Sequence, residues 1–230
     1  MIYQQKFKKR AIALFVMCFI LLTAKAQQDS VTNLPNFLFP SFTKCFIKFK
    51  NGELKTAIVN YNVVDEELVF IQDNAYMTLE NPEAVIDTLY VGGRVFMPFN
   101  TNAFYELFST GAINLFMQYK KDAELVGTTT AYGVKSQAAN ATYRKQIYGS
   151  ATGNVDLSVP SQFKLTENNS YWIKKEGNMH KFTSKRQFLK ICKDKDDEIS
   201  KFLNTHTIHF NNISNLKELV NYCNDTVYKQ

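Results

Sequence analysis

Glycine, proline and cysteine are all scarce in this chain, which has 9, 5 and 4 of them among 230 residues. The low glycine and proline content excludes a collagen-like protein, and four cysteines are too few for a disulfide scaffold. A hydrophobic share of 45% with 21% charged residues excludes a disordered chain and a coiled coil. The composition therefore indicates a globular protein that is long enough to bury one good core.

Motifs of catalysis and cofactor binding are also missing. The chain has no P-loop, no Gly-x-Ser-x-Gly turn and only 3 histidines. Glu66-Glu67 and the pair Glu80 and Glu83 could supply the two carboxylates of a glycosidase, but acidic pairs of this kind usually decorate turns. We therefore predict no catalytic, cofactor-binding or metal-binding residues and favour a protein that is not an enzyme. A hydrolase that uses dispersed carboxylates is the alternative.

The first 26 residues have the three parts of a secretory signal peptide. Basic side chains within 6–10 precede an apolar run over 11–24, and Ala24-Lys25-Ala26 has small residues where a signal peptidase reads them. The apolar run is shorter than the roughly 20 residues that span a bilayer. We therefore expect cleavage after Ala26, no transmembrane span after cleavage, and a periplasmic or secreted protein.

Cleavage would change the charge of the protein. Residues 1–26 hold five of the 27 basic residues and none of the 21 acidic residues, so the mature chain would carry 22 and 21. A nearly neutral chain gives no electrostatic reason to bind nucleic acid. We expect the partner to be an envelope protein, a glycan or a lipid.

From residue 44 onward the pattern is that of short β-strands. Cys45, Ile47 and Phe49 alternate with polar residues, so they share one face of a strand. Asn51-Gly52 follows and predicts a type I′ hairpin. Further short apolar runs separated by turn residues indicate an antiparallel meander.

The domain organisation follows from these patterns. After the signal peptide we expect an extended leader over 27–43 and an antiparallel β body over 44–183, with a polar, irregular insertion at 126–160. Residues 184–230 have apolar side chains at helical spacing and predict short helices that dock on the sheet. The expected class is α+β, mainly antiparallel β, with the body either a small barrel or a curled sheet.

Capping residues mark where the C-terminal helices should begin. Ser184 and Gln187 form a capping box before a helix over 185–193. A second helix is expected over 194–204, with acidic residues in its first turn as the helix dipole favours. Ser214 is the expected cap of a third helix, over 215–223.

Three cysteines remain after residue 26. Cys192 and Cys223 lie in the two helix-like segments and are the plausible disulfide pair if the protein is exported. Cys45 lies on the apolar face of its strand and is expected to be a buried thiol.

Aspartate followed by Ser or Thr and then a small or aliphatic residue occurs more often than composition predicts. The three matches place candidate O-glycosylation at Ser30, Thr88 and Thr226. This pattern resembles the O-glycosylation sequon of exported proteins in Bacteroidota-type bacteria. Glycans need exposed acceptors, which is expected of the two matches near the chain ends.

Three longer stretches carry a resemblance to a protein group. They are Asn60-Tyr61-Asn62 with 67–71, Arg94-Val95-Phe96 with 104–107, and the tail from Phe188 to Tyr222. Together they resemble a group of small exported proteins of Bacteroidota-type Gram-negative bacteria with no assigned activity. The resemblance implies export and assigns no catalytic residue.

Aromatic residues make up 14% of the chain and several lie at expected strand ends, among them Phe96, Phe99, Phe104, Tyr105 and Phe108. Most such side chains pack in cores, whereas exposed ones would form a binding patch. We therefore predict a cell-envelope protein with a binding or structural role. A carrier of lipid or another apolar ligand is a further alternative and needs a hollow apolar interior.

Overall fold

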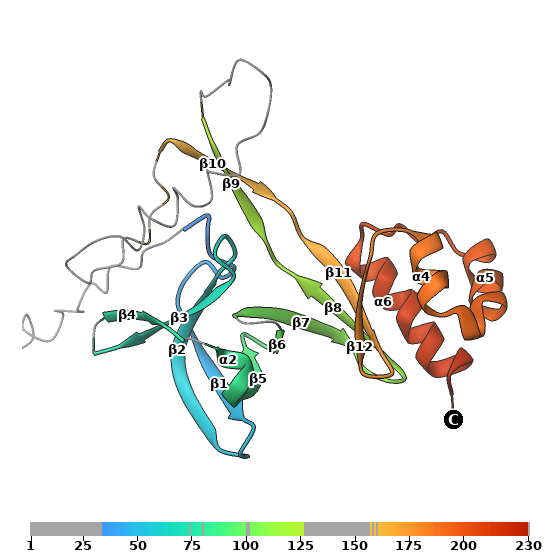
Figure 1. The fold of residues 1–230 in the computed structure, drawn as a ribbon, viewed down its shortest axis with the longest axis horizontal. Helices are drawn as coiled ribbons and strands as arrows, with labels where there is room; N and C mark the ends of the chain where they lie inside the picture. Colours follow the sequence, from blue (N-terminus) through green and yellow to red (C-terminus); the bar gives the residue numbers. More distant parts are fainter. Residues whose placement is uncertain are drawn as a thin grey trace, which may run out of the picture. The chain divides into compact units, whose positions relative to one another are not determined.

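A computed structural model describes residues 34–73, 75–79, 81–99, 102–126, 157, 159 and 161–229 (Figure 1). Within these residues the protein is mainly antiparallel β-sheet, and short helices follow the last strand. The α+β class expected from the sequence is confirmed. No helix of the described residues is both long and apolar enough to cross a membrane.

Two four-stranded meanders make up most of the sheet. The first contains β1 (Thr43–Phe49), β2 (Leu54–Asn62), β3 (Glu67–Gln72) and β4 (Ala75–Thr78). A single helical turn, α2 (Pro82–Val85), leads to the second, which contains β5 (Ile86–Val91), β6 (Arg94–Phe99), β7 (Ala103–Ser109) and β8 (Ile113–Gln118). Strand β1 pairs with β5 and so joins the two meanders edge to edge.

Two further strands complete the ten-stranded sheet. They are β11 (Ser170–Lys175) and β12 (Asn178–Phe182), and the strand order is β12-β11-β8-β7-β6-β5-β1-β2-β3-β4. Within the described residues the edges β12 and β4 are not paired with each other, so the sheet is open. The small-barrel alternative is therefore wrong.

A two-stranded ribbon extends the β8–β11 pair. It consists of β9 (Lys121–Leu125) and β10 (Phe163–Glu167), which pair with each other as a separate two-stranded sheet. The amide of Asn168 donates to the Lys120 carbonyl at 2.8 Å across the junction between the two pairs. Residues 126–160 thus connect the strands of one ribbon, and most of this predicted insertion lies outside the described residues.

The tight turns of the sheet place residues with positive φ at the positions that each turn type requires. At Gly92-Gly93 and at Glu176-Gly177 both central residues have positive φ, as a type I′ turn requires. At 50–52 only Gly52 does, and its amide donates to the Phe49 carbonyl at 3.0 Å. The hairpin after β1 is therefore a three-residue loop rather than the predicted type I′ turn, because Asn51 keeps negative φ and glycine takes the left-handed position.

The C-terminal segment forms the short helices that its apolar spacing predicts. In chain order they are α4 (Lys185–Ile191), the 3₁₀ turn η1 (Lys193–Lys195), α5 (Asp196–Thr205), α6 (Ile213–Tyr222) and the π turn η2 (Cys223–Val227). Ser184 caps α4 by accepting from the Gln187 amide, as expected. The cap of α6 is Asn212 instead of Ser214, because Asn212 is extended and its side chain accepts from two amides of the first turn.

These helices close one end of a sheet face. Their apolar side chains form one core cluster with side chains of β8, β11 and β12; its fully buried members include Ile113, Leu115, Ile173, Phe182, Phe188, Ile199, Leu216, Leu219 and Val220. Asn224 fixes the helical end to β8, since its side chain accepts from the Ile113 amide and donates to the Ile113 carbonyl, both at 2.9 Å. The predicted docking of the tail on the sheet is confirmed.

Candidate functional site

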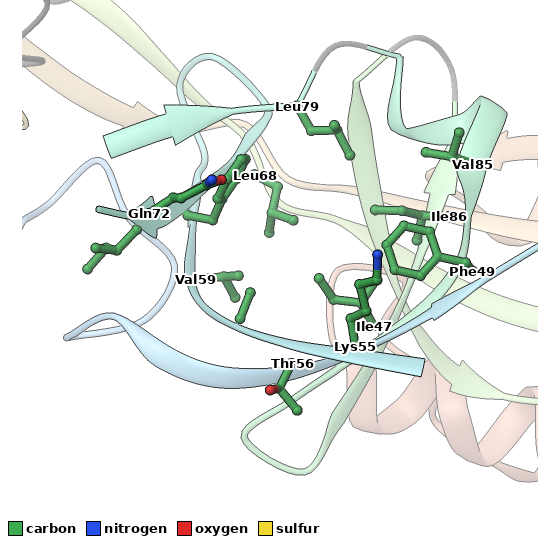
Figure 2. A pocket seen from close by; sticks show the side chains of 13 residues that line it. Ile47, Phe49, Lys55, Thr56, Val59, Leu68, Gln72, Leu79, Val85 and Ile86 are labelled. Carbon is green, nitrogen blue, oxygen red and sulfur yellow. The ribbon is translucent and has the colours of Figure 1, made fainter. Parts of the chain in front are cut away.

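An apolar pocket opens at the other end of the sheet, among β1, β2, β3 and α2 (Figure 2). Its volume is about 450 Å³. The side chains that line it are Ile47, Phe49, Lys55, Thr56, Ala57, Val59, Leu68, Phe70, Ile71, Gln72, Leu79, Val85 and Ile86. A volume of this size lies within the roughly 300–1,000 Å³ that small-molecule sites occupy.

Strand periodicity explains the walls of the pocket. Ile47 and Phe49 alternate on one face of β1, and Ile47 lies directly opposite Lys55 of β2. Ala57 and Val59 follow Lys55 at period two, so they continue the same wall. The apolar residues of this wall belong to or pack against a second buried cluster that also contains Cys45, Leu89 and Phe96, so the pocket is an opening in a core.

The helical turn α2 shapes the rim. Asn81 has a φ of 50°, which turns the chain sharply before Pro82 begins the helix. The Val85 carbonyl accepts from the Lys50 amide at 2.9 Å, which ties the end of α2 to the loop after β1. Val85 and Ile86 are thereby held beside Phe49 (Figure 2).

Lys55 is the only charged residue among the thirteen that line the pocket. Its ammonium nitrogen lies 5.5 Å from the centre of the Phe49 ring and forms an ion pair with Glu53 at 3.2 Å. About half of each charged side chain is exposed, so the pair is solvated and its attraction is weak. The pocket therefore combines apolar walls with one accessible cation at the rim.

A buried ion pair lies at the middle of the same sheet face. Glu106 of β7 accepts from Nε and Nη2 of Arg94 at 2.8 and 2.6 Å, and from the Tyr119 hydroxyl at 2.6 Å. The guanidinium also lies about 5 Å from the ring centres of Phe39, Phe96 and Tyr119. Burial and the hydrogen bond to Glu106 raise the pKa of Tyr119 above its ordinary value. This satisfied cluster is structural, because each charge has its partner.

This cluster was not predicted from the sequence, although the sequence carries a signal for it. Glu106 is the only charged residue in a strand, AFYELFS, that is otherwise apolar apart from its last residue. A carboxylate in such a run is buried only if a cation pairs with it. Arg94 is the single arginine among the described strands, so the pair could have been anticipated.

The structure places the two predicted disulfide partners in one core cluster. Cys192 and Cys223 are both fully buried, and both are free thiols, as is Cys45. Burial raises the pKa of Cys192 to about 11 and that of Cys223 to about 12. The disulfide between Cys192 and Cys223 stays a prediction, which a measurement of the oxidation state of the two thiols would test.

The three candidate glycosylation sites have different surroundings. Ser30 lies outside the described residues. Thr88 lies in β5 and is only 8% exposed, with its hydroxyl donating to Asp87 at 3.1 Å. Thr226 is exposed in η2. Since a glycan needs an exposed acceptor, Thr226 is the better of the two described candidates.

The carboxylates of the hydrolase alternative have different surroundings where the structure describes them. Glu66 accepts from Lys120 at 2.8 Å and from Gln118, while Glu83 is exposed on α2 and Glu80 lies outside the described residues. No group of three or more His, Cys, Asp or Glu side chains among the described residues is placed to hold a metal ion.

The aromatic residues predicted at strand ends mostly fill cores. Phe96 and Phe104 are buried in the cluster around the pocket. On the opposite face Phe99, Tyr105 and Trp172 form a row in which Tyr105 lies 5.1 Å from Phe99 and 5.5 Å from Trp172, measured between ring centres. Tyr105 is itself buried, so this row packs against the sheet as a small core.

Comparisons with known proteins assign no family. No protein-family model, curated protein or solved structure matches the chain. The resemblance to small exported proteins therefore stays a prediction.

Proposed function

We propose that this protein is an exported, non-enzymatic binding protein that holds a single apolar chain with an anionic head in the pocket between β1, β2, β3 and α2. The observation that carries the proposal is the lining: ten of its thirteen residues are apolar, two are neutral polar residues, and Lys55 alone is charged. Such a set binds by displacing water from apolar walls, with a few polar groups that fix orientation.

The apolar walls supply most of the expected affinity. Burial of apolar surface contributes roughly 25 cal/mol for each Å² removed from water. The solvated Lys55 contributes little free energy by comparison, because exposed ion pairs are worth about 0–1 kcal/mol. We therefore expect the chain length of the ligand to set its affinity, and Lys55 to set the preference for an anionic head.

Export is the second part of the proposal. Its support is the sequence pattern of residues 1–26, in which a basic region, an apolar run and small residues succeed one another. Intact mass of the protein recovered from its own cells tests it: we expect a chain that begins at Gln27, and a retained Met1 would contradict export.

A filled pocket is the direct test of binding. Dodecanoate should displace the fluorescent anion 1-anilinonaphthalene-8-sulfonate from the unmodified protein, and Ala57→Phe should weaken both ligands by at least about tenfold, or about 1.4 kcal/mol. Ile58→Phe is the matched control, because Ile58 is the next residue of β2, is exposed and does not line the pocket. Equal binding by Ala57→Phe and the unmodified protein would contradict the proposal.

The role of Lys55 has its own test. Lys55→Gln should weaken dodecanoate by about twofold to fivefold and leave dodecanol unchanged. Lys48→Gln is the control, since Lys48 has the same charge but lies on the other face of β1, paired with Asp87 at 3.0 Å. Equal losses for dodecanoate and dodecanol would show that Lys55 acts only through packing of its methylene groups.

A further inference from the structure

A second groove lies along the sheet edge, far from the pocket in strand order. It has a volume of about 530 Å³ and is lined by Met179, His180 and Lys181 of β12 and by Gln187, Lys190 and Ile191 of α4. Because three consecutive strand residues line it, the groove follows the edge of β12 rather than one face. Strand β12 is an edge of the ten-stranded sheet, at the opposite end from β4 (Figure 1).

The hairpin geometry shows which backbone groups of β12 point into this groove. The two-residue turn Glu176-Gly177 makes Lys175 and Asn178 a hydrogen-bonded pair, and such pairs alternate along an antiparallel ladder. Met179 and Lys181 therefore lie at non-hydrogen-bonded positions opposite β11. Their N–H and C=O groups point away from the sheet, where no strand of the described residues pairs with them.

Thr183, the next outward-facing position of this alternation, confirms that these backbone groups point away from β11. Thr183 donates its amide to Oε1 of Gln187 at 2.7 Å, so the side chain of α4 satisfies the outward amide that follows Lys181. Gln187 thus ends the open edge on one side, and the turn at 176–177 ends it on the other. The open stretch offers two outward donors and two outward acceptors, which fits a short added strand.

We propose that β12 binds an extended, acidic segment of a partner protein, which adds to the sheet as a strand between β12 and α4. The charge of the groove selects this occupant, because Lys181 and Lys190 line it together with His180 and no carboxylate of the described residues does. A second copy of β12 would bring the Lys181 side chains of the two copies to the same edge, which like-charge repulsion disfavours. Main-chain hydrogen bonds would supply the pairing and the lysines the preference for acidic side chains.

The probe is a fluorescein-labelled peptide of about six residues in which Glu and Val alternate, a length typical of one strand. Its binding to the full chain is followed by fluorescence anisotropy, and a peptide with Gln in place of each Glu is the control. We expect the acidic peptide to bind at least about tenfold more tightly than the Gln peptide. Equal binding of the two peptides, or self-association of the protein through this edge in sedimentation, would overturn the proposal.

Two variants separate strand addition from simple charge attraction. Lys181→Gln removes the charge and keeps the outward N–H, whereas Lys181→Pro removes both and leaves the ladder to β11 intact, because that N–H does not take part in it. We expect Lys181→Pro to lower affinity for the acidic peptide at least about fivefold below Lys181→Gln, and equal affinities would overturn strand addition.

Amide exchange of the unmodified protein is the independent measurement if the proline variant does not fold. The amides of Met179 and Lys181 should become protected when peptide is added, and unchanged exchange at both would overturn the proposal.

Discussion

The two ends of one sheet face are closed in different ways. Strand pairing carries a continuous row of side chains across this face, from Ile47 through Leu89, Phe96, Glu106, Met117 and Tyr171 to Phe182. At the Phe182 end the helices α4, α5 and α6 complete a core, whereas at the Ile47 end a pocket stays open beside the single turn α2. Among the described residues, the same apolar pattern thus forms a sealed core where helices cover it and an open pocket where they do not.

The buried pair of Arg94 and Glu106 lies between these two ends. Glu106 belongs to the row that crosses the face, with Phe96 on one side and Met117 on the other. The core cluster around the pocket and the cluster under the helices share no buried residue. The ion pair therefore lies at the boundary between the part of the face that the helices cover and the part that contains the open pocket.

The largest expected effect is in the helical core. Phe188→Ala should lower the free energy of unfolding by about 3–5 kcal/mol, because Phe188 is fully buried and its removal leaves a cavity. Urea denaturation measures this, with the exposed Lys190→Ala on the same helix as the control, expected within about 0.5 kcal/mol of the unmodified protein. Similar values for the two variants would show that the helices do not share the core of the sheet.

The second largest loss of stability is expected when the buried pair of Arg94 and Glu106 is broken. Glu106→Gln should cost about 3 kcal/mol, since it leaves the Arg94 guanidinium without its anion at a site where the Glu106 side chain is 8% exposed. Glu198→Gln is the matched control, because its ion pair with Lys195 is exposed and worth about 0–1 kcal/mol. Equal losses in urea denaturation would contradict a structural role for the buried pair.

Alkaline pH should weaken the helical end. The pKa of Cys192 is raised by burial from 9.0 to about 11 and that of Cys223 to about 12, so the folded state holds these protons more tightly than the unfolded state. This contribution to stability is complete below pH 9 and is lost as pH rises through about 11 and then about 12. Urea denaturation across this range measures the loss, which should be smaller in Cys192→Ala/Cys223→Ala.

The same titration tests the predicted disulfide. A bridge between Cys192 and Cys223 would remove both titrating thiols, so the oxidised protein would lose less stability between pH 9 and 12 than the reduced protein. Identical curves before and after reduction would indicate that the two thiols are free, as the structure has them.

The smallest effect is expected on the outer face of β1. Phe46 is 52% exposed, lies opposite the exposed Tyr90 and is not among the residues that line the pocket. Phe46→Ser should change the free energy of unfolding by no more than about 0.5 kcal/mol and leave dodecanoate binding unchanged. A loss of binding would move the site from the pocket to this face.

The sequence predicts the strands and helices well because both are local patterns. The alternation of Cys45, Ile47 and Phe49 and the helical spacing of Leu216, Leu219 and Val220 each indicate their element and its buried face. The open sheet could not be predicted in the same way. It depends on the pairing of β1 with β5, which joins residues about 40 positions apart and leaves no local signal.

The pocket could not be predicted because its lining has the same pattern as a core. Ile47 and Val59 line the pocket although they are classed with the buried side chains, so alternation does not distinguish a wall from an interior. What opens the site is the absence of a covering element in the described structure beside the short α2. Whether an element covers this opening depends on the tertiary arrangement. The only local signal is Pro82 after Asn81, which indicates the turn that begins α2.

The most direct test of the difference between the open end and the helix-covered end of the sheet face is a methyl NMR titration with dodecanoate. The full chain is used, with Ile, Leu and Val methyl groups labelled. We predict shift changes at Ile47, Val59, Leu68 and Ile86, and none at the helical-core methyl groups of Ile113, Leu115, Leu216 and Val220. Changes confined to the helical core, or no changes at saturating ligand, would contradict the claim that the open end of this sheet face is the binding site.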